Sequence, residues 1–323
     1  MIPILIVAGP TASGKSRLAL ALAQRLQGEI VSADSRQVYA RLDIGTAKPD
    51  REELERVRHH LIGIIEPEER YNAGRFSREA AAVIEKLALD GKTPLVCGGT
   101  GFYLQALVKP LFEEPAVPEE AKTRIRIQLS RRFESEGGET LHRELAAVDP
   151  DTAARLHPND FQRVGRALEL YYLTGRTLSG HFRLAKAAAA YRAFTVLLDP
   201  PDKSLKENIR LRARRMLEQG WAGEVEALLA AGVDPRAPGL QSLGYREIIS
   251  QVRGEISREA AFEAIVGRTW QYARRQRTWF RNRPAELRLD PAEADPDRIV
   301  SLWRSQLEKF DGKGGRWPGA LKN

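Results

Sequence analysis

The stretch Gly9-Pro10-Thr11-Ala12-Ser13-Gly14-Lys15-Ser16 decides the fold of this chain. It follows a short apolar run, Ile2 to Val7, that predicts a buried strand, and it precedes apolar residues at helical spacing from Leu18 to Leu26. Gly-x-x-x-x-Gly-Lys-Ser between a strand and a helix is typical of a loop whose backbone N–H groups cradle phosphates. Lys15 adds a charge for the outer phosphates, and the Ser16 hydroxyl is a candidate ligand of Mg²⁺.

Strand and helix patterns alternate over residues 1–110. Buried strands are expected at Glu29–Ser32 and Pro94–Cys97, His59–Ile65 leads into another, and Phe194–Leu198 predicts a strand that returns to the same sheet. Such alternation predicts an α/β fold: a P-loop NTPase-like core with a parallel sheet and helices on both faces.

The pattern changes from about residue 115, where strand-like runs give way to helical ones as far as residue 193. We expect residues 115–193 to form an all-helical insertion. Residues 1–114 and 194–290 would then form a discontinuous catalytic core, and residues 291–323 a C-terminal helix or tail. A length of 323 residues agrees with this division, at roughly 150 residues per domain.

The composition narrows the class of protein. No run of the sequence reaches the roughly 18 apolar residues that span a bilayer, so no membrane association is expected. Cys97 is the single cysteine, so the chain can form neither an intramolecular disulfide nor a cysteine zinc cluster. The absence of disulfides favours the cytoplasm. We expect Cys97 to be a small core residue rather than a nucleophile. The net charge of +8 suits a polyanionic partner, although a basic solvated surface would give the same sum.

Asp34 follows the predicted strand Glu29–Ser32 and therefore lies at the carboxyl edge of the sheet, beside the phosphate loop. It could bind Mg²⁺, act as a general base on an incoming nucleophile, or cap whatever helix follows. Position alone does not decide among the three. Gly98-Gly99-Thr100 is a second glycine-rich strand end on the same edge, where Thr100 can hydrogen-bond a ligand.

Two segments are rich in arginine. Arg163 and Arg166 lie three residues apart on one helix face after the expected cap Asp160, and the simpler interpretation is a solvated face. Residues 268–283 hold six arginines and no acidic residue, with tryptophan and tyrosine between them. That mixture is typical of single-stranded nucleic-acid binding, while the alternative buries the aromatic rings and exposes only the arginines.

Seven segments of the chain, taken in their order along the sequence, resemble the motifs of the tRNA dimethylallyltransferases, also called tRNA isopentenyltransferases. Any one motif is modest support, but the ordered set is specific and extends to about residue 285. Larger eukaryotic members add a zinc finger, which a single cysteine cannot form, so the chain resembles the compact bacterial form. The matching segments are Gly9–Ser16, Ala33–Tyr39, Asp43–Pro49, Gly98–Tyr103, Asn159–Glu169, Leu243–Glu247 and Tyr272–Arg281.

The resemblance implies transfer of a dimethylallyl group from dimethylallyl diphosphate to N6 of the adenosine just 3′ of the anticodon in tRNA, with release of diphosphate. It implies Asp34 as general base, Thr100 and Arg212 as further catalytic residues, and Gly9 to Ser16 around the diphosphate with Mg²⁺ on Ser16. Arg210 or Arg214 could replace Arg212 in another register. We expect a monomer. The residues implied to contact the tRNA anticodon stem-loop are Asp34, Ser35, Arg36, Gln37, Gln162, Arg163, Arg166, Arg274 and Arg277.

Three other functions use the same residues. An adenylate isopentenyltransferase would share the loop and Asp34 but prenylate free AMP. A small-molecule kinase would bind ATP in the same loop and turn it over without a prenyl donor. An RNA-binding regulator with a vestigial nucleotide site would bind tRNA with no turnover that depends on Asp34.

Overall fold

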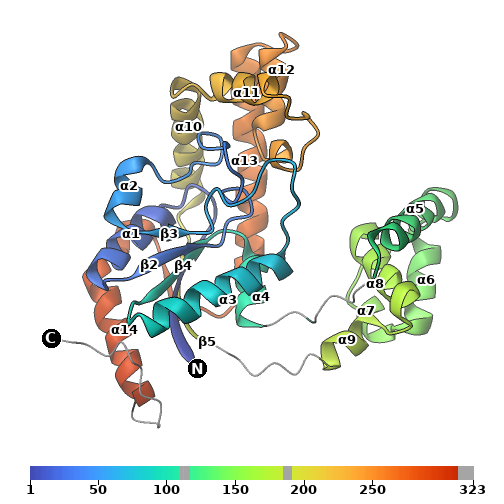
Figure 1. Ribbon diagram of the computed structural model, residues 1–323, viewed down its shortest axis with the longest axis horizontal. Helices are drawn as coiled ribbons and strands as arrows, with labels where there is room; N and C mark the ends of the chain where they lie inside the picture. The colour runs from blue at the N-terminus through green and yellow to red at the C-terminus, as the bar shows by residue number, and fades with distance from the viewer. Residues whose placement is uncertain (110–111, 113–116, 185–190, 312–323) are drawn as a thin grey trace. The chain divides into compact units, whose positions relative to one another are not determined.

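The computed structural model describes residues 1–109, 112, 117–184 and 191–311, which belong to two compact units (Figure 1). Unit 1 comprises Met1–Lys109 and Ala189–Asn323, and unit 2 is Pro110–Ala188. The division lies close to the insertion expected at residues 115–193. Within the described part of the chain, no helix is both long and apolar enough to cross a membrane.

Unit 1 is built on a six-stranded sheet in the order β3-β2-β4-β1-β5-β6. Every pair of neighbouring strands is parallel, and Leu5 at the centre aligns with Leu95 on one side and Phe194 on the other. The predicted α/β class with a parallel sheet is therefore confirmed. The strands are β1 (Ile2–Ala8), β2 (Glu29–Ser32), β3 (His59–His60), β4 (Pro94–Gly98), β5 (Tyr191–Leu198) and β6 (Leu287–Leu289).

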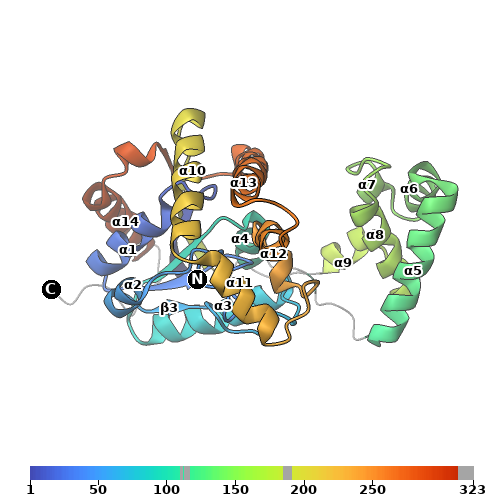
Figure 2. The ribbon, with the colours of Figure 1, turned by 90° about the horizontal axis from the view of Figure 1, so that it is seen from above.

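Helices cover both faces of this sheet (Figure 2). Successive side chains of a strand point to opposite faces. Leu5 and Val7 of β1 accordingly pack in one apolar cluster with α1 (Lys15–Arg25) and α14 (Pro296–Asp311). On the other face, α3 (Ala73–Leu89) and α4 (Gly101–Val108) contact β2, β4 and β5.

The strand boundaries differ from expectation in three places. The extension of a strand through His59–Ile65 was wrong beyond His60, because Leu61 and Gly63 both adopt φ of 62° and end the extended backbone. β5 begins at Tyr191 rather than Phe194. β6 was not predicted, since three residues of alternating type carry too little periodicity to be recognised.

The remaining helices of unit 1 form a second apolar cluster around Trp221 and Tyr245, whose rings meet edge to face. Added Cβ atoms at Gly45 and Gly244 would lie 2.3 and 2.1 Å from the Trp221 indole, so both positions need glycine. The helices of this cluster are α10 (Asp202–Glu218), α11 (Trp221–Ala230), α12 (Tyr245–Val252) and α13 (Arg258–Arg281), whereas α2 (Arg51–Arg56) is the exception and buries none of its residues.

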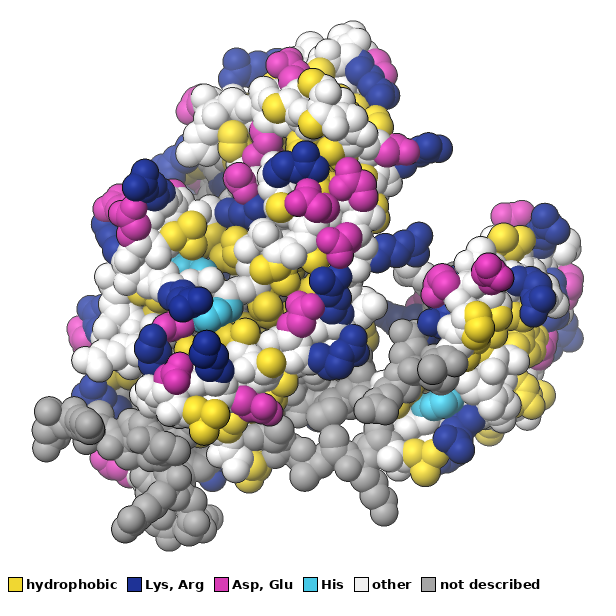
Figure 3. Space-filling view, viewed as in Figure 1, with side chains coloured by type: hydrophobic (Ala, Val, Ile, Leu, Met, Phe, Trp, Pro, Cys, Tyr) yellow, Lys and Arg dark blue, Asp and Glu magenta, His cyan; other side chains and the backbone are white. Residues whose placement is uncertain are grey.

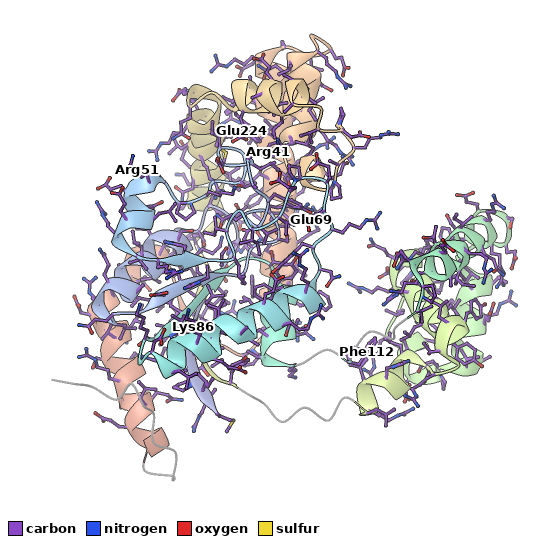
Figure 4. The ribbon with its side chains drawn as sticks, in the orientation of Figure 1. Arg41, Arg51, Glu69, Lys86, Phe112 and Glu224 are labelled. Carbon is purple, nitrogen blue, oxygen red and sulfur yellow. The ribbon has the colours of Figure 1, made fainter. Side chains whose placement is uncertain are left out.

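Glu224 of α11 holds the loop that contains Gly45 (Figure 4). Its carboxylate accepts hydrogen bonds from the backbone N–H groups of Asp43 and Ile44 at 2.7 and 2.6 Å, and from the Tyr245 hydroxyl at 2.7 Å. One half-buried carboxylate thus fixes the start of the Asp43–Pro49 segment against α11 and α12.

Unit 2 is helical throughout its described residues, with a core around Leu129, Leu141 and Leu168. The all-helical character predicted for the insertion is confirmed. Its helices are α5 (Glu119–Glu136), α6 (Gly138–Val148), α7 (Pro150–Ala153), α8 (Phe161–Thr174) and α9 (Leu178–Leu184).

Asp149 fixes the short helix α7 and the start of α9. Its side chain accepts from the Thr152 hydroxyl at 2.7 Å and from the Ser179 N–H at 2.9 Å, and the residue is only 2% exposed. Burial by itself would raise the pKa of Asp149, but the hydrogen bonds from Ser179 and Thr152 outweigh it and leave the pKa below its ordinary value.

We expect Asp149→Ala to destabilise unit 2 by about 2–4 kcal/mol, because it leaves buried donors without an acceptor. Amide hydrogen exchange over α6–α9 in the full chain measures this loss. Asp151→Ala is the matched control, since its pair with Arg183 joins side chains that are 59% and 69% exposed and should contribute at most about 1 kcal/mol. Equal protection in the two variants would contradict the assignment.

Candidate active site

The phosphate loop joins β1 to α1 in a conformation that needs its glycines. Gly14 has φ of 84°, and a Cβ at Gly9 would lie 2.8 Å from the carbonyl oxygen of Leu198. The ammonium of Lys15 is buried and donates to the Pro10 carbonyl at 3.2 Å. Burial lowers the pKa of Lys15, and nearby Arg212 lowers it further, while Cys97 and Asp34 act in the opposite direction. An anionic ligand would relieve this desolvated charge.

Asp34 lies just past the end of β2, as expected. Its Oδ1 accepts from the backbone N–H groups of Arg36 at 2.8 Å and Gln37 at 3.4 Å. The carboxylate therefore does cap the backbone, but it caps a turn over residues 35–38 instead of a helix. Among the described residues, its second oxygen has no hydrogen-bond partner, so capping and proton transfer are compatible roles for the same side chain.

Two cavities share a wall at this edge of the sheet. Thr11, Lys15, Asp34 and Arg212 line both of them. The cavity on the Ser16 side is also lined by the polar residues Ser16, Ser32, Gln37 and His59. The cavity on the Tyr272 side adds Tyr272 and Gln276 with an apolar wall from Ile209, Ala213, Met216 and Ile265. Two ligands entering from different sides would meet at Asp34.

Arg212 of α10 faces this shared wall. Its guanidinium donates to the Thr11 hydroxyl at 3.3 Å. Burial lowers the pKa of Arg212, whereas Asp34 raises it. Arg210 instead pairs with Glu263 at 2.6 Å, and Arg214 lies over the Phe262 ring. Of the three arginines considered for this position, Arg212 is the one that lines the cavities.

Thr100 begins α4 and approaches Asp34 through Ser35. Its hydroxyl accepts from the Ser35 N–H at 3.1 Å. Tyr272 of α13 faces both Thr100 and Asp34, and burial raises the pKa of its hydroxyl to about 12. Cys97, at the end of β4, is buried with its thiol pKa raised to about 11, in agreement with a core residue.

Sequence reasoning missed the contribution of α13 to this edge. Gln276 accepts from the Thr11 N–H at 2.8 Å and donates to the Gly99 carbonyl at 2.8 Å. Trp279 lies against Gly101, where an added Cβ would be 2.1 Å from the indole nitrogen. The available signal was spacing: Gln276 falls on the same face of the helix as the buried Ala273 and Phe280.

The candidate RNA contacts of unit 1 have differing environments. Arg274 and Arg36 are exposed. Gln37 uses its amide internally, because it accepts from the Ser32 hydroxyl at 3.0 Å and donates to the Ala47 carbonyl at 2.8 Å. Arg277 pairs with Asp199 at 2.9 Å and also with Asp202. The aromatic rings between the arginines are buried or half-buried, as the alternative interpretation of this helix held.

The candidate RNA contacts of unit 2 lie at the start of α8. Asp160 caps the helix by accepting from the Arg163 N–H at 3.3 Å, as predicted. The Arg163 side chain is 68% exposed and pairs with Asp160 at 3.3 Å, and Gln162 is exposed beside it. Arg166 pairs with the buried Glu169 at 3.1 Å and so also supports the unit's core.

Basic and acidic side chains are interspersed on the face of unit 1 seen in Figure 3. The positive charge of the chain is not gathered into one patch on that face. Net charge alone therefore does not locate a nucleic-acid interface on that face, and the candidate contacts there are individual side chains.

Comparisons with known proteins agree with this geometry. The chain is 46% identical over 281 residues to tRNA dimethylallyltransferase 1 of Citrifermentans bemidjiense, covering 86% of this chain and 89% of that protein. It is 46% identical over 289 residues to the tRNA dimethylallyltransferase of Myxococcus xanthus, covering 88% and 92%.

A solved structure is similar over nearly the whole chain. It is the full-length tRNA isopentenylpyrophosphate transferase from Bacillus halodurans, with a TM-score of 0.69, 32% identity, and coverage of 97% of this chain and 98% of that one. Residues 37–283 match the protein family described as IPP transferase. With the phosphate loop, Asp34 and Arg212 on one shared wall, these similarities show that the chain belongs to the IPP transferase family.

Proposed function

We propose that this chain transfers a dimethylallyl group from dimethylallyl diphosphate to N6 of the adenosine 3′-adjacent to the anticodon in tRNA, releasing diphosphate. The observation that carries the proposal is the position of Asp34 on the wall shared by two cavities, together with Lys15 and Arg212. One cavity would admit the allylic donor and the other the target base, with the carboxylate between them.

In this mechanism the N6 amine attacks the first carbon of the dimethylallyl group as the bond from that carbon to the diphosphate oxygen breaks. Lys15, Arg212 and the loop N–H groups stabilise the charge that grows on the departing diphosphate. Asp34 accepts the proton lost by the amine. Because the lone pair of the amine is delocalised into the adenine ring, a positioned base is worth about 10²–10⁴ in rate.

Magnesium fits the residues on the Ser16 side of the wall. The Ser16 hydroxyl lines that cavity and is an oxygen donor of the kind that Mg²⁺ accepts, which leaves the Asp34 carboxylate for proton transfer. Within the described ranges no group of three or more His, Cys, Asp or Glu side chains comes together. This suits an ion that takes most of its ligands from substrate phosphates and water. When bound, it would supply positive charge against the diphosphate.

The target adenosine must leave its stack to reach this edge of the sheet, since a stacked base cannot enter an enclosed site. We propose that Asp34, Ser35, Arg36 and Gln37 border the extruded base. Gln162, Arg163 and Arg166 of unit 2 would bind the anticodon stem-loop. Arg274 would add an exposed charge on α13, while Arg277 could join only by leaving its acidic partners.

We also propose a monomer as the active species. The requirement for tRNA supports action in the cytoplasm. An adenylate isopentenyltransferase would place AMP in the same cavity, and a kinase would place ATP on the same loop, so the decisive experiment offers all of these substrates.

A transfer assay tests the proposal: purified protein, Mg²⁺, radiolabelled dimethylallyl diphosphate, and either unmodified tRNA or AMP as acceptor. We expect label in tRNA alone, and none after chelation of the metal. Label in AMP would keep the chemistry and change the substrate. ATP turnover with no label in either acceptor would favour the kinase.

Asp34→Asn should reduce turnover by about 10²–10⁴ while the tRNA dissociation constant stays within about two-fold. The amide keeps the Oδ1 acceptor that caps the turn but cannot take the proton. Single-turnover transfer and filter binding measure the two quantities. Asp50→Asn is the control, because Asp50 caps α2 through the Glu53 N–H at 2.8 Å and lies outside both cavities. A comparable loss of tRNA binding would make Asp34 a structural cap only.

Arg163→Ala should weaken tRNA binding and reduce its salt dependence by about one phosphate contact. The lost pair with Asp160 is exposed, so the fold should be little affected. Arg143→Ala on α6 is the control, since among the described residues this exposed arginine makes one side-chain hydrogen bond, to the Thr140 hydroxyl at 3.5 Å. An unchanged salt slope for Arg163→Ala would count against an RNA contact there.

A further inference from the structure

Gln276 is a buried polar side chain that the proposed mechanism does not yet use. It is 6% exposed, yet both ends of its amide are hydrogen-bonded to backbone groups of other segments. The oxygen accepts from the Thr11 N–H in the phosphate loop, and the nitrogen donates to the Gly99 carbonyl at the end of β4. A single side chain from residue 276 thus joins loops that follow two different strands.

Both of these loops continue directly into residues of the proposed site. The Thr11 hydroxyl accepts from Arg212 at 3.3 Å, so the residue that Gln276 holds also receives the guanidinium. Gly99 is followed by Thr100. A Cβ at Gly99 would lie 2.5 Å from the Gln276 nitrogen and 3.5 Å from the Lys15 ammonium. The amide therefore packs against the strand end beside the loop's catalytic charge.

We infer that Gln276 is a positioning residue. It sets the separation between the phosphate loop and the backbone at Gly99 and Thr100, and this separation determines the affinity for the diphosphate group. The inference rests on the proposed function for the identity of the ligand. Its action runs through Thr11 and Gly99, and Gln276 itself does not touch the reacting atoms.

The chemistry of the site requires an amide at this position. One neighbour is a donor and the other is an acceptor, and glutamine offers an acceptor and a donor on one planar group. Glutamate has nearly the same shape but, when ionised, faces the Gly99 carbonyl with a second acceptor. Methionine fills a similar volume and makes neither bond. The two replacements separate hydrogen bonding from packing.

The test compares Gln276→Met and Gln276→Glu with wild type, using the full chain. Inorganic diphosphate binding is measured by calorimetry, and the Michaelis constant for dimethylallyl diphosphate by steady-state transfer to tRNA. Filter binding gives the tRNA affinity, and thermal unfolding reports whether each variant is folded. Gln24→Met, an exposed glutamine on α1, is the matched control.

Both Gln276 variants should weaken diphosphate binding and raise the Michaelis constant for dimethylallyl diphosphate about 10–100-fold, because each leaves a buried backbone group of one loop without its partner. The tRNA dissociation constant should stay within about two-fold. Wild-type diphosphate binding in Gln276→Met would reduce Gln276 to packing and overturn the inference. A loss confined to tRNA affinity would overturn it as well, by making Gln276 an RNA contact.

The inference and the proposed function fail differently. If wild type binds diphosphate but labels no tRNA, the proposed acceptor is wrong, and the calorimetric comparison still decides the role of Gln276. If a variant does not fold, the other one decides, because Gln276→Glu retains the acceptor for the Thr11 N–H and Gln276→Met retains the packing.

Discussion

The site depends on holding three strand ends together. β1, β4 and β5 finish at the same edge of a parallel sheet, and the loops that follow them must keep a fixed spacing beyond the ends of the strands. α13 supplies that constraint from the far end of the sequence. Gln276 contacts the loops after β1 and β4, Arg277 pairs with Asp199 just after β5, and Trp279 packs on Gly101. The arginine-rich helix is therefore a structural part of the catalytic core.

Electrostatics at the shared wall follow from this arrangement. Burial lowers the pKa of both Lys15 and Arg212, and Asp34 is the carboxylate that favours the charged form of both. A site with one buried and one half-buried cation beside a single carboxylate is well suited to a polyanionic ligand, because fixed positive charges in a partly desolvated site stabilise added negative charge. The apolar wall of Ile209, Met216 and Ile265 faces the same space. Anionic and apolar parts of one substrate can thus be accommodated together.

Much of the fold and of the candidate site could be predicted from the sequence, because the features concerned are local. The phosphate loop, the strand ends at Asp34 and Thr100, and the cap at Asp160 each depend on a few consecutive residues. The register of Arg212 came from the resemblance to a family, since three arginines alternate on α10. β6 could not be predicted with these rules, because three residues leave little periodic signal, and spacing could place Gln276 on the buried face of α13 without revealing its partners, which lie far away in the chain. Arg277 was predicted to contact RNA from the arginine–aromatic pattern of its segment and from the family resemblance, neither of which reveals its acidic partners.

The chain order of the sheet has a consequence for how the protein is made. β1 is central and pairs with β5, but Tyr191 is synthesised long after Ile2, and unit 2 comes between them. The ribosome adds about 5–20 residues per second. One edge of β1 therefore stays unpaired for many seconds before β5 is synthesised. Unit 2 has an apolar core of its own and can fold during that interval. Chaperone protection of an open sheet edge during translation would therefore matter more for this enzyme than its modest size suggests.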